Sequence, residues 1–397
     1  MTINPGFRSL APYVWPIYAP WMAASLGMSV LLVALPILLI DAGQGYAVAG
    51  VVAGAGGAGA TAAALPTGWS TDRWGPARVG VGSLVLMVSS AAMMAIWEHP
   101  AWLGVHHFLF GAGSLGVMLS RQADLTARIP VVLRGRAMSL MGGSMRFSVF
   151  LGTAIGGVLV DLVGARGAFV AAGLGAAIGL PAVLPGARHP DTEVASVGGG
   201  GPHLGTVVRR HRRRLLHAGL FGLSAMATRE GRMVLLPLVG VALGLAPSSI
   251  GILVAAGYAA DLVLFPVSGM VMDRFGRRTA MVPAYGLLAG GLLSLMIADS
   301  STGVLLAGLV MGVGNGLSSG SLFTLSSDVA PAEGTATFLS AVSLLTDGGR
   351  IVGPVVVGVV ADQWGLDAAA LALSAVMVAG VLWLGLVVGE TGERSGA

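Results

Sequence analysis

The chain has no cysteine and no lysine, and only 10% of its 397 residues are charged. Without cysteine it has no disulfides and no thiol chemistry. Without lysine it has no Gly-x-x-x-x-Gly-Lys loop for nucleotide phosphates, which excludes that way of using ATP as an energy source. All 22 basic residues are arginine, which does not release its proton in a protein. Any proton carrier must therefore be a carboxylate or a histidine.

Apolar sequence takes the place of the missing charge. The chain is 55% hydrophobic, with a mean hydropathy of +0.85, so lipid rather than water must surround most of it. About twelve segments reach the roughly 20 residues needed to cross a bilayer. They lie near 13–40, 46–69, 78–97, 101–125, 137–162, 166–185, 215–240, 248–270, 279–298, 302–327, 335–360 and 367–389. We predict an all-α integral membrane protein with twelve transmembrane helices in two pseudo-symmetric six-helix bundles.

The two halves of the chain repeat each other at a gapless offset of 201 residues. The matched pairs include Pro36 with Pro237, Gly50 with Gly251, Gly68 with Gly269, Asp72 with Asp273, Gly111 with Gly312, Pro130 with Pro331, Gly152 with Gly353, and Asp161 with Asp362. We predict bundles at 1–185 and 215–397, joined by a cytoplasmic linker at 186–214. Two similar halves in a bilayer are typical of secondary transporters.

Positive charge outside the spans is concentrated on one face of the membrane. Arg8, Arg394 and the arginine run at 209–214 belong to this face. The connections on the opposite face contain a single arginine, Arg166. The positive-inside rule therefore places both termini in the cytoplasm. It also explains the net charge of +4 without a nucleic acid partner.

Residues 54–59 read Gly-Ala-Gly-Gly-Ala-Gly, which formally matches a dinucleotide-binding fingerprint. That fingerprint needs a preceding strand, and here the run lies inside an apolar span. Small residues let membrane helices approach closely, so we predict helix packing instead. The sequence contains no nucleophile–base pair or metal cluster, and we expect neither a cofactor nor enzyme activity.

One motif occurs twice in the connections on the arginine-rich face. Its residues are Gly68, Asp72, Arg73, Gly75 and Arg78 between spans 2 and 3, and Gly269, Asp273, Arg274, Gly276, Arg277 and Arg278 between spans 8 and 9. Both copies resemble the cytoplasmic signature of the major facilitator superfamily, although the first has Pro76 and Ala77 where basic residues are usual. The resemblance implies a transporter of a bacterial cytoplasmic membrane, most similar to the twelve-helix drug–proton antiporters.

The same resemblance implies a cytoplasmic gate in which loop arginines pair with an acid at the end of span 4 or span 10. The acids in this chain that match are Asp124 and Asp328, with Arg121 close to the first. Ion pairs at a helix end need no ligand, so we interpret these charges as gate structure rather than as a substrate site.

Further charges lie deep inside spans 5, 7, 8 and 11. They are Arg146, Arg229, Glu230, Arg232, Asp261, Asp347 and Arg350. A charge at this depth is costly unless it faces a wet cavity or a partner, so we predict a substrate or proton-coupling cavity. A set of ion pairs that merely orient the helices is the alternative. Four arginines against three acids favour an anionic, zwitterionic or neutral cargo over a dication.

The resemblance implies that spans 5 and 8 meet between the halves, as do spans 2 and 11. Our hypothesis is that Arg146 pairs with Asp261 in one conformation and that protonation of Asp261 releases the pair. Glu230 and Asp347 are alternative proton carriers. His107 occupies a part of span 4 where antiporters of this family carry other polar residues. Its neighbour His106 points about 100° away, which argues against a shared metal ion.

Small residues in spans 5 and 11 indicate bent or closely packed helices. Gly152, Gly156 and Gly157 resemble an antiporter signature with Thr153 in place of proline, and span 11 contains Gly353 and Pro354. This partial match favours export over import.

We therefore predict a monomeric proton-coupled transporter that exports a small amphiphilic organic compound by alternating access. The alternatives are proton-symport uptake of a small organic anion, a lipid or glycolipid flippase, and a membrane scaffold or sensor without transport activity. Its partners would be the substrate, protons and the lipid bilayer.

Overall fold

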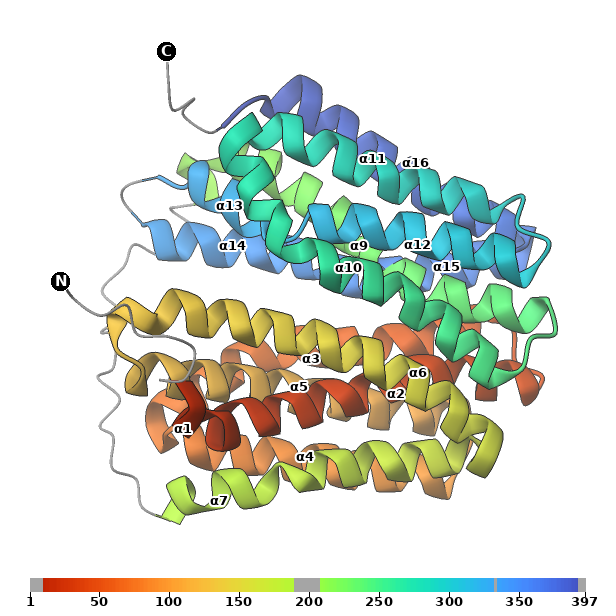
Figure 1. Cartoon of the computed structure of the whole chain (residues 1–397), viewed down its shortest axis with the longest axis horizontal. Helices are drawn as coiled ribbons and strands as arrows, with labels where there is room; N and C mark the ends of the chain where they lie inside the picture. Colours follow the sequence, from red (N-terminus) through yellow and green to blue (C-terminus); the bar gives the residue numbers. More distant parts are fainter. Residues whose placement is uncertain (1–9, 189–207, 332–333, 392–397) are drawn as a thin grey trace. The chain divides into compact units, whose positions relative to one another are not determined.

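The computed structural model of the chain describes residues 10–188, 208–331 and 334–391. These ranges contain helices joined by short connections and no strand (Figure 1). The predicted all-helical fold is therefore confirmed for these residues. Arg8, Arg394 and residues 189–207 of the predicted linker lie outside the described residues.

The helices of the first half alternate with short turns. They are α1 (Ala11–Tyr13), the π-helical turn η2 (Val14–Tyr18), α2 (Ala19–Asp41), α3 (Tyr46–Trp74), α4 (Pro76–Ile96), α5 (Pro100–Arg128), α6 (Val131–Ile178) and α7 (Leu180–Arg188).

The second half repeats the pattern with more interruptions. Its helices are α9 (Arg212–Ala242), α10 (Pro247–Phe275), α11 (Arg277–Leu295), α12 (Ser301–Leu317), α13 (Ser321–Asp328), α14 (Thr335–Asp347), α15 (Gly349–Trp364), α16 (Leu366–Trp383) and the π-helical turn η3 (Leu384–Val388).

Nine helical segments of the described residues are long and apolar enough to cross a membrane. One of them, Val132–Gly186, has 55 residues, which is more than twice the roughly 20 that one crossing needs. It is divided at Gly164, whose φ of 72° and ψ of 173° are not helical. The more polar α9 and α11 add 31 and 19 residues, lengths that suffice to span. These segments are consistent with twelve spans.

Contacts group the chain into two units. The first contains Met1–Leu35 and Ala55–Val197, and the second contains Pro36–Gly54 and Gly198–Ala397. The start of α3 therefore belongs to the second unit, where the backbone of Gly50 lies against that of Gly358 in α15. The bundle boundaries at residues 185 and 215 stay a prediction.

In the first unit, α4 packs against α5, α6 and α7. The beginning of the first span is fixed to α6 by two hydrogen bonds. Tyr18 Oη donates to the carbonyl of Ala137 at 3.0 Å, and Trp21 Nε1 donates to the carbonyl of Met141 at 3.1 Å. Both rings are buried in an apolar cluster that also includes Leu125 of α5. Each aromatic ring thus fills the core while its polar atom keeps a partner.

In the second unit, α12 packs against both α10 and α11, and α9 contacts α14, α15 and α16 (Figure 1). The Cα of Gly316 in α12 sits so close to α10 that an added Cβ would be 2.9 Å from the carbonyl oxygen of Asp261. Small residues therefore allow these helices to touch backbone to backbone.

The sequence repeat reappears as repeated contacts within each unit. A Cβ added at Gly111 would overlap the carbonyl oxygen of Gly56, and a Cβ added at Gly312 would overlap that of Gly257. Each glycine of the first contact has its counterpart in the second contact 201 residues later in the sequence. This geometry explains Gly56 and Gly59 as a packing surface for α5, and the sequence predicts close helix packing for this run.

The turns repeat in the same way, because the glycines that close them share a left-handed backbone with φ between 67° and 90°. These glycines are Gly43, Gly75 and Gly164 in the first half and, at the offset of 201, Gly244, Gly276 and Gly365 in the second.

Gly111→Ala should lower stability by about 1–3 kcal/mol, because the new methyl group has no room beside the α3 backbone. Gly82→Ala is the matched control, since a Cβ there meets nothing within 4 Å. Alanine favours the helix over glycine, so this control should be neutral or stabilising by up to about 1 kcal/mol. Thermal unfolding of the detergent-purified variants measures both. Equal midpoints for the two variants would contradict the packing interpretation.

Candidate functional site

Three of the predicted deep charges form one ion-pair group in the second unit. Arg350 donates from Nε to Asp347 Oδ1 at 2.9 Å and from Nη1 to Glu230 Oε1 at 3.4 Å. The three side chains lie on α15, α14 and α9, and between 24% and 37% of each is exposed. One guanidinium thus pairs with two carboxylates from two other helices.

Arg229 contacts the interruption between α12 and α13. Its Nη2 donates to Ser318 Oγ at 2.8 Å, to the Ser318 carbonyl at 3.2 Å and to Tyr285 Oη at 3.0 Å. Ser268 Oγ donates to the neighbouring carbonyl of Ser319 at 2.6 Å. These bonds supply partners to carbonyls at the helix break. The geometry gives Arg229 a structural task inside the second unit.

Arg232 and Asp261 belong to a buried polar cluster formed by α9, α10 and α12. The guanidinium carbon of Arg232 lies 5.3 Å from the centre of the Tyr258 ring. Asp261 follows Tyr258 by one helical turn and accepts a hydrogen bond from Asn315 Nδ2 at 2.7 Å. Each of the four residues is less than one-tenth exposed.

The remaining deep residues lie in the first unit. Arg146 is partly buried on α6, and its Nη1 donates to the Gly142 carbonyl at 3.3 Å. Because Arg146 and Asp261 are in different units, their predicted pairing stays a hypothesis. The ring of His107 lies beside Gly56 of α3, whereas that of His106 lies 4.4 Å from the Trp102 ring. The two imidazoles therefore have different surroundings.

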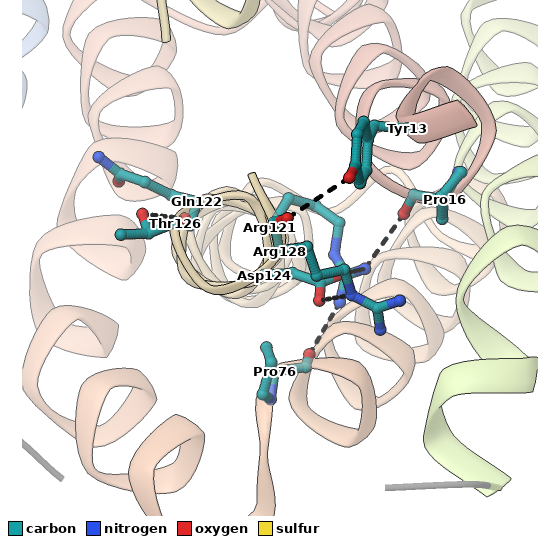
Figure 2. Close-up of polar contacts among 8 residues, drawn as sticks. All are labelled: Tyr13, Pro16, Pro76, Arg121, Gln122, Asp124, Thr126 and Arg128. Atoms are coloured by element: carbon teal, nitrogen blue, oxygen red, sulfur yellow. Dashed lines mark hydrogen bonds and ion pairs between the residues drawn. The ribbon is translucent and has the colours of Figure 1, made fainter. Parts of the chain in front are cut away.

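The helix ends beside the first motif copy are joined by a charge cluster in which Arg121 and Asp124 are buried and Arg128 is partly exposed (Figure 2). Arg121 donates from Nη1 to Asp124 at 3.1 Å, and Arg128 Nε donates to the other oxygen of Asp124 at 2.5 Å. Arg121 also donates to the carbonyls of Pro76 at 2.9 Å and Pro16 at 3.2 Å. Arg121 thereby connects α5 to the start of α4 and to η2. A cavity of about 240 Å³ lies against this cluster.

The other residues of the first copy are more exposed. Asp72, Arg73 and Arg78 lie on the surface, with the Arg73 guanidinium 5.6 Å from the Trp69 ring. Asp124, the acid that the sequence places in the gate of this unit, pairs with two arginines of its own helix α5. The motif glycine Gly75 has a φ of 81° at the start of α4, a backbone conformation that favours glycine.

In the second copy, Arg277 connects the motif to the end of α13. Its Nη1 donates to Asp273 Oδ1 at 2.8 Å, and its Nε donates to Asp328 Oδ2 at 3.4 Å. The hydrogen bond to Asp273 is the main cause that raises the pKa of the Arg277 guanidinium above its ordinary value. Arg274 points elsewhere, with its guanidinium carbon 5.5 Å from the Phe275 ring.

Glu390 binds the start of α11 next to this copy. Its carboxylate accepts the backbone N–H groups of Arg277 at 2.8 Å and Arg278 at 3.1 Å. A carboxylate stabilises a helix start because the first N–H groups have no partner within the helix. Gly276, with a φ of 88°, passes so close that an added Cβ would be 2.9 Å from Glu390 Oε2.

The glycines of spans 5 and 11 pack against the first helix of their own half. A Cβ at Gly152 would be 2.8 Å from the carbonyl oxygen of Leu26, and one at Gly353 would overlap the carbonyl oxygen of Ala227. Pro354 lies within α15, and the interruption of span 11 is at Gly348. Two further glycines of span 5 are Gly156, which lies against Val30, and the buried Gly157.

Three features of these sites are not among the residues predicted from the sequence. Tyr258, Tyr285 and Asn315 are ordinary residues of apolar spans until the fold places them beside deep charges. The break at Ser318 did leave a signal, because Ser318-Ser319-Gly320 replaces Val-Met-Leu at the equivalent positions of the first repeat. Glu390 left none, since only the fold brings it to α11.

Arg229→Leu should lower the unfolding midpoint markedly, because Ser318 and Tyr285 lose a charged hydrogen-bond donor, a loss of about 2–4 kcal/mol. Arg166→Leu is the control, because Arg166 pairs with Glu98 at 2.7 Å with its side chain 59% exposed and such pairs contribute at most about 1 kcal/mol. Thermal unfolding in detergent checks the ranking. An Arg229→Leu midpoint as high as that of the control would exclude the structural task.

Comparison with known proteins gives a consistent result. A family model described as Major Facilitator Superfamily matches residues 22–229 and residues 218–396. A bacterial homolog of the human lysosomal transporter Spinster, in an inward-facing and unoccupied conformation, is 16% identical with a TM-score of 0.74. The similarity covers 96% of this chain and 95% of that chain.

The nucleoside transporter NupG is 15% identical to this chain with a TM-score of 0.72, over 93% of this chain and 97% of that chain. Identities this low show a shared fold alone. The family match is stronger evidence than the structural similarity, because its two matched segments together cover nearly the whole sequence. The chain belongs to the major facilitator superfamily and is therefore a multi-pass membrane transporter rather than an enzyme.

Proposed function

We propose that this chain is a proton-coupled secondary transporter that exports a small amphiphilic organic compound by alternating access. The observation that carries the proposal is Asp261, a carboxyl group that is 2% exposed in the middle of α10. A carboxyl group held in a membrane span is costly, so its presence favours a task in transport over a purely structural one.

The partner of Asp261 suits a group that changes its protonation state. Asn315 donates an amide N–H to Oδ2, and a carboxyl oxygen accepts such a bond whether or not the other oxygen carries a proton. Asp261 can therefore take up and release a proton without losing this contact. The group formed by Glu230, Asp347 and Arg350 provides a second place where a proton can be held.

Export is supported by the antiporter-like glycines at Gly152 and Gly156, which let α6 approach α2 closely. We further propose that the two motif copies act as a cytoplasmic gate, that both termini are cytoplasmic, that the protein works as a monomer, and that it resides in a bacterial inner membrane. The arginine distribution supports the orientation.

Proton-symport uptake of a small organic anion is the second candidate, and one observation favours it. Arg232 and Asp261 share a buried cluster, so an anion bound at Arg232 would lie near Asp261. Negative charge nearby favours the protonated form of a carboxyl group. Anion and proton would then bind together, as symport requires.

Asp261→Asn should abolish proton-driven transport while substrate binding stays measurable, because the amide keeps the shape of the carboxyl group and cannot carry the proton. A thermal-shift screen of the purified chain at two pH values first selects ligands. Flux of these ligands is then measured in liposomes with an internal pH-sensitive dye. Antiport makes substrate entry release protons from the lumen, whereas symport makes substrate and protons enter together.

Asp299→Asn, at an exposed carboxylate between α11 and α12, is the matched control and should keep full activity. Full proton-coupled flux in Asp261→Asn would rule out Asp261 as the carrier. If no selected ligand shows flux that responds to a pH gradient in the unmodified protein, proton coupling itself is wrong.

A further inference from the structure

Four polar atoms without a hydrogen-bond partner gather on three residues of the second unit. They are Nε and Nη2 of Arg232, Oη of Tyr258 and Oδ1 of Asn315. The exposed fractions of these residues are 3%, 6% and 8%. The Arg232 guanidinium lies 5.3 Å from the Tyr258 ring, and Asn315 binds Asp261, which is one turn from Tyr258 on α10. Three helices thus bring unused donors and an unused acceptor to one place.

Buried polar atoms without hydrogen-bond partners destabilise a folded protein, and a charged one lowers its stability more than a neutral one. Membrane spans usually satisfy every polar atom internally. An arginine with two free N–H directions therefore calls for an explanation beyond packing.

The repeat shows that the fold does not need these polar residues. The positions 201 residues before Arg232, Tyr258, Asp261 and Asn315 hold Leu31, Gly57, Ala60 and Ser114. The backbone contact beside them is retained, because Gly56 meets Gly111 in the first unit and Gly257 meets Gly312 in the second. The same helix packing forms with small or apolar residues, so the polar cluster is an addition to the second unit.

The chemistry of the unused atoms is specific. Nε–H and Nη2–H are the two parallel donors on one edge of a guanidinium, and their spacing matches the two oxygens of a carboxylate. The Tyr258 hydroxyl can add a third donor. Asn315 Oδ1 needs a donor in return, such as an N–H or O–H group beside the carboxylate. The positive charge of Arg232 disfavours a cationic ligand.

We propose that Arg232, Tyr258 and Asn315 form a substrate subsite for a carboxylate that carries a neighbouring N–H or O–H group. N-acylated amino acids and hydroxy acids are the corresponding chemical class. The inference rests on the proposed transport function, because alternating access must open these buried residues to the compound. It narrows the amphiphilic cargo to a carboxylate and holds for export and for uptake.

Binding of paired probes tests the subsite without knowledge of the natural cargo. The probes are N-benzoylglycine and N-dodecanoylglycine, each beside its methyl ester, which has the same apolar part and no charge. Ligand-induced thermal shift of the full chain at constant pH measures the affinity. We expect at least one carboxylate to bind at least about tenfold more tightly than its ester.

Three variants assign the preference to the proposed atoms. Arg232→Lys keeps the charge and loses the parallel donors, so it should remove most of the acid-over-ester preference. Tyr258→Phe should weaken carboxylate binding about threefold or more without lowering the ligand-free midpoint, because the hydroxyl has no internal partner. Arg166→Lys, at a surface ion pair, should leave the preference unchanged.

The proposal is overturned if neither carboxylate stabilises the protein up to millimolar concentration, or if Arg232→Lys keeps the full preference. It is also overturned if Tyr258→Phe leaves carboxylate affinity unchanged, a result that remains available should Arg232→Lys fail to fold. Specific carboxylate binding without proton-coupled flux would refute the proposed function and leave the subsite intact. Proton-coupled flux of neutral or cationic compounds alone would support the proposed function and refute the subsite.

Discussion

A lipid-embedded chain must provide its own partners for each polar group in its spans, because hydrocarbon offers neither hydrogen bonds nor countercharges. Two of the deep arginines meet most of this requirement, although Arg229 Nε has no partner. Arg350 connects two carboxylates from other helices, and Arg229 stabilises a break in span 10. Arg232 stands apart, because two of its donors have no partner. The exception identifies where a ligand would complete the structure.

The repeat separates what the fold requires from what has been added to it. Both units keep glycine contacts such as Gly56 with Gly111 and Gly257 with Gly312, which set the spacing of the helices. The polar cluster around Asp261 and the break after α12 occur in the second half, whereas the equivalent α5 is continuous through Arg128. The two halves thus share a frame of helix contacts, and the second half carries a polar cluster on it.

The two motif copies solve the same helix-end problem with different atoms. In the first unit the helix after the motif begins with Pro76, which has no N–H to satisfy, and Arg121 binds its carbonyl. In the second unit the helix begins with Arg277, and Glu390 accepts the free N–H groups. The departure of the first copy from the usual basic residues therefore matches a different way of fixing the helix end.

The sequence by itself determined the spans, the repeat and the close packing of the small residues at 54–59, because apolar length and small residues act locally. It also indicated which spans carry charge. Only the tertiary structure decided the partners, since Arg229 meets Ser318 and Arg350 meets Glu230 across long stretches of chain. Hydrogen bonds form or fail within a few tenths of an ångström. That distance is set by the packing of several helices at once, so no pattern in a single helix can encode it.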